Sequence, residues 1–401
     1  FPNAQMFGFT GTPIFAPNSV GKRTTKDLFT QQLHSYVITD AIRDENVLRF
    51  AIEYVYHADE EAKELAGKEF FEHPERIETV VDWVLKNHSA KTRNRQFGAI
   101  MCVGSVDSLI RYYDVFRAKK IAGDHDLNIA AIFTYAANED DPDADGLIPD
   151  IDFPGDTVSA TVLPKRDKLV EIVHDYNDMF GVQESVLDGK GFYTYYKSIA
   201  KRVKARDRKP FVREQGIDIL IVVNMFLTGF DAKTVNTLYV DKNLRYHGLI
   251  QAFSRTNRVL GPEKSQGNIV CFRDLKTNTD EAIALFADKN AQETVIVPNY
   301  AEQLEKLNLA VERLLSIVPN ADSVDSLRDE DAKTQFVKAF REVLRLRNIL
   351  TTYSEFEDSH IPLHPQAFED FKSKYLDLAD GVTGGGSEEV PDALDGIDFE
   401  L

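Results

Sequence analysis

Short apolar runs alternate with helical patterns between about residue 35 and residue 300. Runs rich in β-branched and aromatic residues favour strands, whereas apolar residues three or four positions apart favour helices. Strands separated by helices are typical of βαβ units, so the pattern predicts an α/β fold with a largely parallel sheet. The expected strands are Val47–Tyr56, Phe97–Val103, Ile129–Tyr135, Ile217–Val223, Val235–Val240 and Asn268–Phe272, and the expected helices are Glu75–Lys86, Val106–Ala122, Lys165–Phe180, Phe192–Arg206 and Tyr246–Arg258.

From about Tyr300 onward, only helical spacing remains. Apolar residues recur three or four positions apart in successive groups, which predicts helices that pack against one another. The groups are Leu304, Leu307, Val311, Leu314, Leu315 and Val318, then Phe336, Phe340, Val343, Leu344 and Leu350, then Phe368, Phe371 and Tyr375. The sequence therefore predicts an α/β domain over residues 35–300, an all-α domain over residues 301–380 and an acidic flexible tail over residues 381–401.

The net charge of −18 argues against a protein that binds polyanions over its whole surface, although a local basic groove can still bind nucleic acid. Acidic residues gather between residues 139 and 156, where Gly and Pro predict a solvated loop. Eight basic residues lie between residues 197 and 213 with a single acid among them. This run is either a DNA-binding surface or an ordinary solvated helix face. The candidate contacts are Lys201, Arg202 and Lys204.

The two cysteines, Cys102 and Cys271, cannot make a disulfide framework. Both lie in apolar runs, so we expect buried thiols with a structural role. The apolar run Ile219–Val223 is far shorter than the roughly 20 residues that cross a bilayer, so no membrane partner is expected. The chain begins at Phe1 without a Met, in the middle of an apolar phrase, and we expect it to be part of a longer protein.

Several local patterns suggest ligand sites but lack essential residues. Val20–Thr24 resembles a phosphate loop, but Arg23 stands where a magnesium-binding Ser or Thr is needed. His360 and His364 are four residues apart, but an intervening Pro and the lack of nearby Cys argue against a metal site. We therefore expect no metal site. The acids Asp329–Asp331 are better explained as a helix start, where negative charge favours the helix dipole.

The most informative polar stretch is Gln251–Arg258, at the end of a predicted helix. Gln251, Arg255 and Arg258 have the spacing i, i+4 and i+7, which predicts that they share one helical face. Two guanidinium groups and an amide on one face make a donor cluster suited to phosphate oxygens. The alternative is a solvated or salt-bridged helix face.

Two further stretches carry small polar residues near predicted turns. Leu227–Asp231 follows the apolar strand at residues 217–223, and ligands gather at the carboxyl ends of strands in open α/β sheets. Thr228 supplies a hydroxyl and an N–H, Gly229 permits an unusual backbone angle, and Asp231 can accept from a ribose hydroxyl or orient an arginine. The alternative is an ordinary strand-ending turn. The other stretch is Phe9–Pro13.

Together these stretches resemble the motifs of superfamily 2 helicases and translocases, in the right order. Thr10–Pro13 resembles the third motif, Phe97–Ser105 has the position of the fourth, Thr228–Asp231 resembles the fifth and Gln251–Arg258 the sixth. The motif sequences Phe-Thr-Gly-Thr-Pro-Ile and Gln-Ala-Phe-Ser-Arg-Thr-Asn-Arg resemble those of the motor (R) subunit of type I restriction enzymes. Phe226–Asp231 and Thr237–Lys242 fit the same family, and the resemblance covers roughly residues 1–275.

The resemblance implies that residues 35–300 form the second RecA-like motor domain and that residues 1–34 are the end of the first motor domain with its linker. The family's phosphate loop, acidic magnesium motif and nuclease match nothing in this chain. ATP and Mg²⁺ would therefore be bound mainly by the first motor domain, and we expect this chain alone to hydrolyse ATP negligibly.

The resemblance also implies residue roles. Arg255 and Arg258 would stabilise charge on the transferring phosphoryl group, and Gln251 would bind the terminal phosphate or its attacking water. The implied nucleotide contacts are Asp231, Gly229 and Thr10, and the implied contacts to the DNA backbone are Thr12, Gly104, Ser105 and Thr228.

The implied function is that of the ATP-dependent DNA translocase subunit of a type I site-specific deoxyribonuclease in the bacterial cytoplasm. Its implied partners are double-stranded DNA and a methyltransferase core of modification and specificity subunits. One rival is another superfamily 2 enzyme, either a chromatin remodeller or an RNA helicase, but those families usually carry Gly at the position of Ser254. Another rival is a RecA-like interaction module that has lost catalysis, against which the retained Gln251, Arg255 and Arg258 count.

Overall fold

The chain divides into two compact units in a computed structural model that describes residues 7–19, 23–29, 31–55, 68–134, 163–207, 210–227, 230–260, 264–287 and 294–383. The first, here called the α/β unit, comprises Phe1–Val259 and Gln266–Val297. The second, the helical unit, comprises Leu260–Ser265 and Pro298–Leu401. The expected division of the first unit at residue 34 stays a prediction, and the acidic run at residues 139–156 lies outside the described residues.

A six-stranded parallel sheet forms the centre of the α/β unit, with the strand order β1-β6-β5-β2-β4-β3. This confirms the predicted fold class, and each expected strand is present within three residues of its predicted ends. The first expected strand starts late because Val47 forms an isolated bridge with Arg258 instead of joining the sheet. The strands are β1 (Phe50–Tyr54), β2 (Gly98–Val103), β3 (Ile129–Ile132), β4 (Ile219–Val222), β5 (Val235–Asp241) and β6 (Gly267–Cys271).

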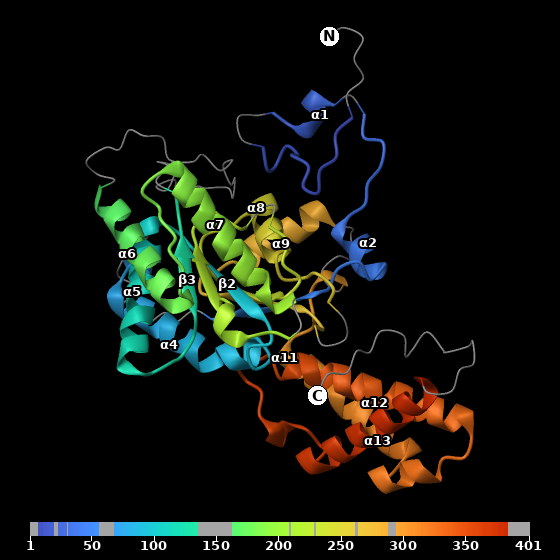
Figure 1. Ribbon diagram of the computed structural model, residues 1–401. Coiled ribbons are helices and arrows are strands. Elements are labelled where there is room, and N and C mark those ends of the chain that lie inside the picture. Colours follow the sequence, from blue (N-terminus) through green and yellow to red (C-terminus); the bar gives the residue numbers. More distant parts are fainter. Residues whose placement is uncertain are drawn as a thin grey trace. The chain divides into compact units, whose positions relative to one another are not determined.

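Helices flank this sheet (Figure 1). Most agree with the sequence pattern, but the helix expected to end at Lys86 continues to Lys91, and the one expected to end at Arg206 gives way to a 3₁₀ turn after Val203. The longer helices are α4 (Pro74–Lys91), α5 (Val106–Ala122), α6 (Leu163–Phe180), α7 (Gly189–Val203), α8 (Tyr246–Phe253) and α9 (Lys276–Phe286), and the short ones are α1 (Thr25–Leu28), α2 (Ile38–Arg43) and α3 (Lys68–Phe71).

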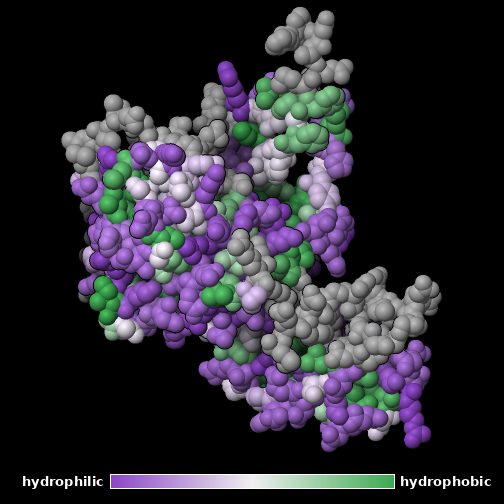
Figure 2. All heavy atoms as spheres, in the orientation of Figure 1, coloured by the Kyte–Doolittle hydropathy of each residue, from purple (hydrophilic) through white to green (hydrophobic). Residues whose placement is uncertain are grey.

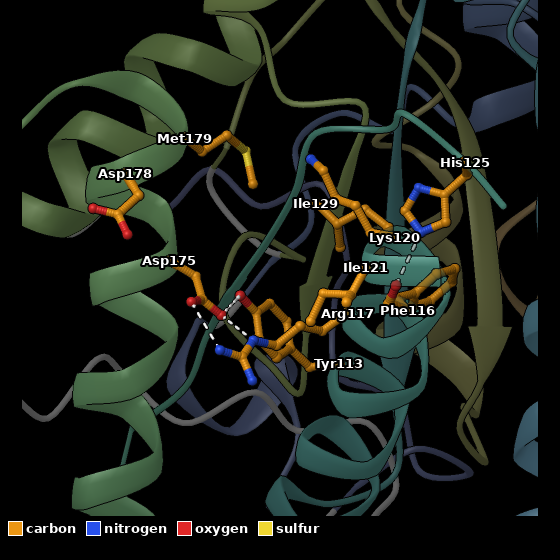
Figure 3. A pocket seen from close by; sticks show the side chains of 10 residues that line it. All are labelled: Tyr113, Phe116, Arg117, Lys120, Ile121, His125, Ile129, Asp175, Asp178 and Met179. Atoms are coloured by element: carbon orange, nitrogen blue, oxygen red, sulfur yellow. Dashed lines mark hydrogen bonds and ion pairs between the residues drawn. The ribbon is translucent and has the colours of Figure 1, made fainter. Parts of the chain in front are cut away.

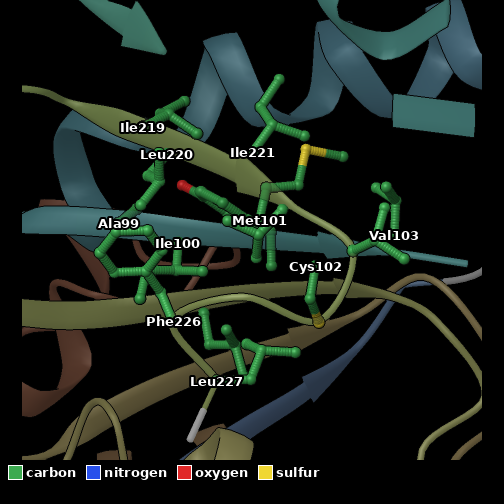
Figure 4. Close-up of a cluster of buried hydrophobic side chains, with 14 of the residues drawn as sticks. Ala99, Ile100, Met101, Cys102, Val103, Ile219, Leu220, Ile221, Phe226 and Leu227 are labelled. Carbon is green, nitrogen blue, oxygen red and sulfur yellow. The ribbon is translucent and has the colours of Figure 1, made fainter. Parts of the chain in front are cut away.

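The core of the α/β unit is built on its central strands. Every residue of β2, β4 and β5 is buried, as expected for parallel strands that are covered on both faces. Figure 4 shows β2 and β4 beside Phe226 and Leu227 from the segment after β4. Cys102 and Cys271 are both buried free thiols, which confirms their predicted structural character.

The helical unit contains three longer helices, α11 (Tyr300–Ile317), α12 (Glu330–Leu350) and α13 (Pro365–Thr383). Phe336, Phe340 and Phe371 lie fully within its core and contact one another through their rings. The Asp329 side chain caps α12, which confirms the predicted helix start. The predicted tail, apart from its first residues, lies outside the described residues.

The two histidines of the helical unit make separate local contacts. His360 Nδ1 lies 2.6 Å from the hydroxyl of Tyr300, and His364 Nδ1 accepts from the backbone N–H of Gln366. Among the described residues, no helix is long and apolar enough to span a bilayer.

Candidate functional site

Three of the predicted motif stretches come together in the α/β unit. Gln251, on α8, donates from its side-chain amide to the hydroxyl of Thr12, 2.7 Å away. Arg255 donates to the carbonyl oxygen of Phe230, and Arg258 Nε lies 3.4 Å from Asp231 Oδ1. Residues separated by more than 200 positions in the chain therefore form one continuous polar cluster, here called the motif cluster.

The motif cluster is not a single helical face, so that prediction is wrong. α8 ends at Phe253, and Arg258 lies in the extended bridge with Val47. The helix ends there because the hydroxyl of Thr256 turns back and donates to the carbonyl of Phe253. The chain then leaves the helix axis, and the turn rather than the helical period brings Arg258 beside Asp231.

Close packing holds this turn in place. Thr256 is fully buried against Gly267, the first residue of β6. A Cβ atom on Gly267 would lie 2.2 Å from the hydroxyl oxygen of Thr256, so this position has no room for a side chain. The start of β6 and the turn that carries the two arginines are thus fixed to each other.

The two arginines of the motif cluster have different surroundings. Among the described residues, Arg255 donates hydrogen bonds only to backbone carbonyl oxygens. These are the carbonyl of Gln251, 3.1 Å away, and that of Phe230. Burial, followed by the positive charge of Arg258, lowers the pKa of Arg255. Arg258 is instead 43% exposed, and its partner Asp231 is 60% exposed. Arg255 therefore fastens two chain segments together, whereas Arg258 is available to an incoming ligand.

The segment around Thr12 is held beside α8 by a second contact. Asn18 is almost fully buried, its side-chain oxygen accepts from the N–H of Phe15, and its amide nitrogen lies 3.4 Å from His247 Nδ1 on α8. Thr10 is exposed, and its hydroxyl accepts from the N–H of Thr12. Thr228 and Gly229, both predicted site residues, lie outside the described residues.

Gly104 and Ser105 follow β2 directly. The hydroxyl of Ser105 accepts from the N–H of Ser108 and so caps α5, and the carbonyl of Ser105 accepts from the N–H of Leu109. Gly104 faces Arg273, since a Cβ atom there would lie 3.1 Å from a terminal guanidinium nitrogen. The predicted DNA role of the two residues stays a prediction.

A buried ionic network beside Gly104 was missed by the sequence reasoning. Asp241, at the end of β5, accepts from Arg76 at 2.7 and 3.0 Å, from Arg273 Nε at 3.0 Å and from the Tyr112 hydroxyl at 2.7 Å. Burial alone would raise the pKa of Asp241, but the charges of Arg273 and Arg76 outweigh it and lower the pKa. The guanidinium of Arg273 also lies 3.8 Å from the ring centroid of Phe71.

Next to this network, Lys242 connects β5 to the segment that leads to Phe230. Its ammonium is mostly buried and donates to the carbonyl of Val223, 3.1 Å away, and to the side chain of Asn224. The sequence offered one signal for both residues, because Asp241 and Lys242 are charged residues at the end of an apolar strand.

The basic run divides into buried and exposed cations. Arg206 pairs with the fully buried Asp218 at 2.6 Å, and Arg202 stacks over Phe180 at 4.0 Å from the ring centroid. Lys201 and Lys204 are exposed. Of the three predicted contacts, Arg202 is thus used in packing, and the two lysines are free to bind a partner.

A cavity of about 380 Å³ lies between α5 and α6, away from the motif cluster (Figure 3). Two of its cations already have partners: Arg117 Nε lies 2.6 Å from Asp175 Oδ2, and Lys120 donates to the carbonyl of Leu127. Burial lowers the pKa of Lys120. None of the predicted site residues lines this cavity, so it plays no part in the motif cluster.

Three protein-family models match the chain. Residues 95–274 match "Type I restriction enzyme subunit R domain 3", and residues 295–401 match "Type I restriction and modification enzyme - subunit R C terminal". The chain belongs to the family of type I restriction enzyme R subunits. Residues 1–82 of this R-subunit chain match the SWI2/SNF2 ATPase model, a family that uses ATP.

Relatives of the R-subunit chain are similar over its whole length. A type I restriction enzyme endonuclease subunit of Staphylococcus aureus (strain COL) is 40% identical over 100% of the chain, and one of Staphylococcus saprophyticus is 42% identical over the same span. The chain covers 42% of the length of each relative.

Proposed function

We propose that this chain supplies the second motor domain of an ATP-dependent DNA translocase, the R subunit of a type I restriction enzyme. The observation that carries this proposal is the half-exposed Arg258–Asp231 pair, which belongs to the same motif cluster as the Gln251–Thr12 contact. An arginine held loosely by a surface carboxylate can exchange that partner for a phosphate, because both ligands suit its planar fork.

In this proposal Arg258 is the catalytic residue and Arg255 a positioning residue. Arg258 would leave Asp231 and stabilise the charge that spreads over the phosphoryl oxygens during ATP hydrolysis, a contribution of about 10³–10⁵ in rate. Arg255 would keep Phe230 and its neighbours in place while this happens. Gln251, in the same motif cluster, would bind the terminal phosphate or its attacking water, and Asp231, once released, would accept from the ribose.

ATP itself would be held mainly by the first motor domain, to which Thr10 and Gly229 add contacts from this chain. Among the described residues, no three His, Cys, Asp or Glu side chains converge on one point, so we assign the Mg²⁺ that accompanies ATP to none of them. Closure of the two motor domains on ATP and their reopening after hydrolysis would move the subunit along duplex DNA.

The DNA backbone would be held by Thr12, Gly104, Ser105 and Thr228, through hydroxyl and N–H groups that carry no sequence information. Sequence choice would then belong to the methyltransferase core of modification and specificity subunits, the proposed protein partners. Cleavage would belong to the nuclease of the complete subunit.

The test compares alanine variants of the two arginines in the complete R subunit. Arg258→Ala should lower DNA-stimulated ATP hydrolysis by about 10³-fold or more and leave the melting temperature nearly unchanged, because a surface pair contributes at most about 1 kcal/mol. Arg258→Lys should restore little activity, since an ammonium cannot reproduce the fork. Arg255→Ala should lower both stability, by about 1–3 kcal/mol, and activity, because two backbone acceptors lose their donor.

Arg43→Ala is the matched control, because Arg43 forms a comparable exposed pair with Asp40 at 3.2 Å on α2. Its hydrolysis rate and its melting temperature should both equal those of the unmodified subunit. Wild-type hydrolysis in Arg258→Ala would overturn the catalytic assignment and favour a non-catalytic interaction module.

A further inference from the structure

Helix α7 presents one apolar face to the sheet. Phe192, Tyr195, Ile199 and Val203 are buried along it. The hydroxyl of Tyr195 donates to the carbonyl of Ala131 on β3, 2.8 Å away, which fixes the rotation of the helix about its axis. The opposite face is therefore held towards the surface of the α/β unit.

That outward face carries a row of lysines. Lys190, Lys197, Lys201 and Lys204, here called the lysine stripe, are all exposed and follow helical spacing, with the exposed Thr194 completing the row. No acidic residue occurs between Gly189 and Arg206. At 1.5 Å per residue the stripe is about 20 Å long. In Figure 2 the surface over α7 is mostly hydrophilic in colour.

The lysines of the stripe differ from two lysines on the neighbouring helices α5 and α6. On the neighbouring helices, Lys119 pairs with Asp82 at 2.7 Å and Lys168 pairs with Asp114 at 2.6 Å. Within the described residues, the stripe makes contacts with aromatic rings and no ion pair: Lys197 lies 4.2 Å from the ring centroid of Tyr193 and Lys204 lies 5.2 Å from that of Phe230. Four unneutralised cations thus stand together on a chain with a net charge of −18.

We propose that the lysine stripe binds the phosphate backbone of duplex DNA, a proposal that rests on the translocase function given above. The complementary charge is what identifies the occupant: about 20 Å of duplex carries about six phosphates on one strand. Lysines are compact charges on flexible stems, so they can follow a moving backbone without reading its sequence. Arg202 and Arg206, which are used in packing, are excluded from this contact.

The stripe also adjoins the motif cluster. Lys204 lies over the ring of Phe230, whose carbonyl accepts from Arg255, and Tyr196 of α7 stacks on Phe226 at 4.7 Å between ring centroids. The helix that would hold DNA therefore contacts the segment that would sense ATP. This contact gives DNA binding a direct physical route to the arginines.

The test uses the complete R subunit with the triple variant Lys190→Gln, Lys197→Gln and Lys201→Gln. Its affinity for a short labelled duplex is measured by fluorescence anisotropy from about 50 to 200 mM salt. The slope of log affinity against log salt should become shallower by about 2.7, since each phosphate neutralised contributes about 0.9. The loss should be equal for two unrelated DNA sequences.

The matched control removes the same charge elsewhere, with Lys86→Gln, Lys306→Gln and Lys338→Gln, three exposed lysines on other helices. This control should keep the salt slope of the unmodified subunit. Equal slopes in the triple variant and the control would overturn the proposal, as would a loss confined to one DNA sequence or the absence of duplex binding by the unmodified subunit. None of these variants changes Arg258. The translocase proposal is therefore tested separately, by the hydrolysis rate of the Arg258→Ala variant.

Discussion

Replacing Asp241 tests whether the buried ionic network stabilises the carboxyl edge of the sheet. Asp241 is 1% exposed and receives four hydrogen bonds, two from Arg76 and one each from Arg273 and Tyr112. Asp241→Asn keeps the shape of the side chain but removes its charge, and it places an N–H₂ group among donors. Two guanidinium groups then lose their common counter-charge.

The cost follows from the burial of each partner. Removing one member of a buried ion pair costs about 3–5 kcal/mol, because the remaining charge is left uncompensated. Arg273 is 16% exposed and can recover some hydration, and Arg76 keeps its bond to the carbonyl of Phe272. We therefore expect about 3 kcal/mol for Asp241→Asn and a value nearer 5 kcal/mol for Asp241→Ala, which also leaves a void.

Urea unfolding followed by circular dichroism measures these differences, with Asp82→Asn as the control. Asp82 pairs with Lys119 on the surface and is 57% exposed, so its removal should cost less than about 1 kcal/mol. The reasoning would be refuted if Asp241→Asn cost no more than Asp82→Asn at an unchanged denaturant slope.

The difference in unfolding free energy between the unmodified protein and Asp241→Asn should depend on pH in one direction. Because the pKa of Asp241 is lowered in the folded protein, its carboxylate contributes stability above the unfolded value of about 3.9. The stability gap between the unmodified protein and Asp241→Asn should stay constant from neutral pH to about pH 4 and close as the pH falls further. A gap that closes above about pH 5 would show instead that burial raises the pKa.

Three further predictions concern other parts of the chain. Burial raises the pKa of Cys102 to about 12, so neither cysteine should react with a thiol reagent in the native protein at neutral pH, and both should react on unfolding. Gly267→Ala should displace Thr256 and cost about 1–3 kcal/mol with a matching loss of ATP hydrolysis, whereas Gly189→Ala, which meets no atom within 4 Å, should be tolerated in both assays. Phe340→Ala should destabilise the helical unit by about 3–5 kcal/mol in urea unfolding, because this ring is fully buried.

The strands could be predicted from the sequence because each is a local feature, a short apolar run bounded by polar residues. The end of α8 could not, since it depends on a side-chain bond from Thr256 and on its packing against Gly267. The predicted helix through residues 251–258 is therefore correct up to Phe253, and beyond that residue the chain turns away from the helix axis. The three motif stretches could also be found from the sequence, because each is a run of a few consecutive residues.

The Asp241 network could not be predicted, because it joins residues that are far apart in the chain. Its members come from α4, α5, the end of β5 and the turn after β6, and no local pattern relates Arg76 to Arg273. The sequence shows Arg76 and Arg273 each as one charged residue among many. Only the sheet order brings them to one point, and that order was not part of the prediction.

The position of β1 in the sheet has a consequence for biosynthesis. β1 pairs with β6, which follows about 200 residues later in the chain, and among the described residues its other edge meets only the isolated bridge between Phe50 and Ile296. At roughly 5–20 residues per second, a ribosome needs about 10–40 s to make the partner of a strand that has already emerged. During that interval the hydrogen-bonding edge of β1 is open to neighbouring nascent chains. The first strand of this sheet therefore stays without its neighbour until the last strand has been made.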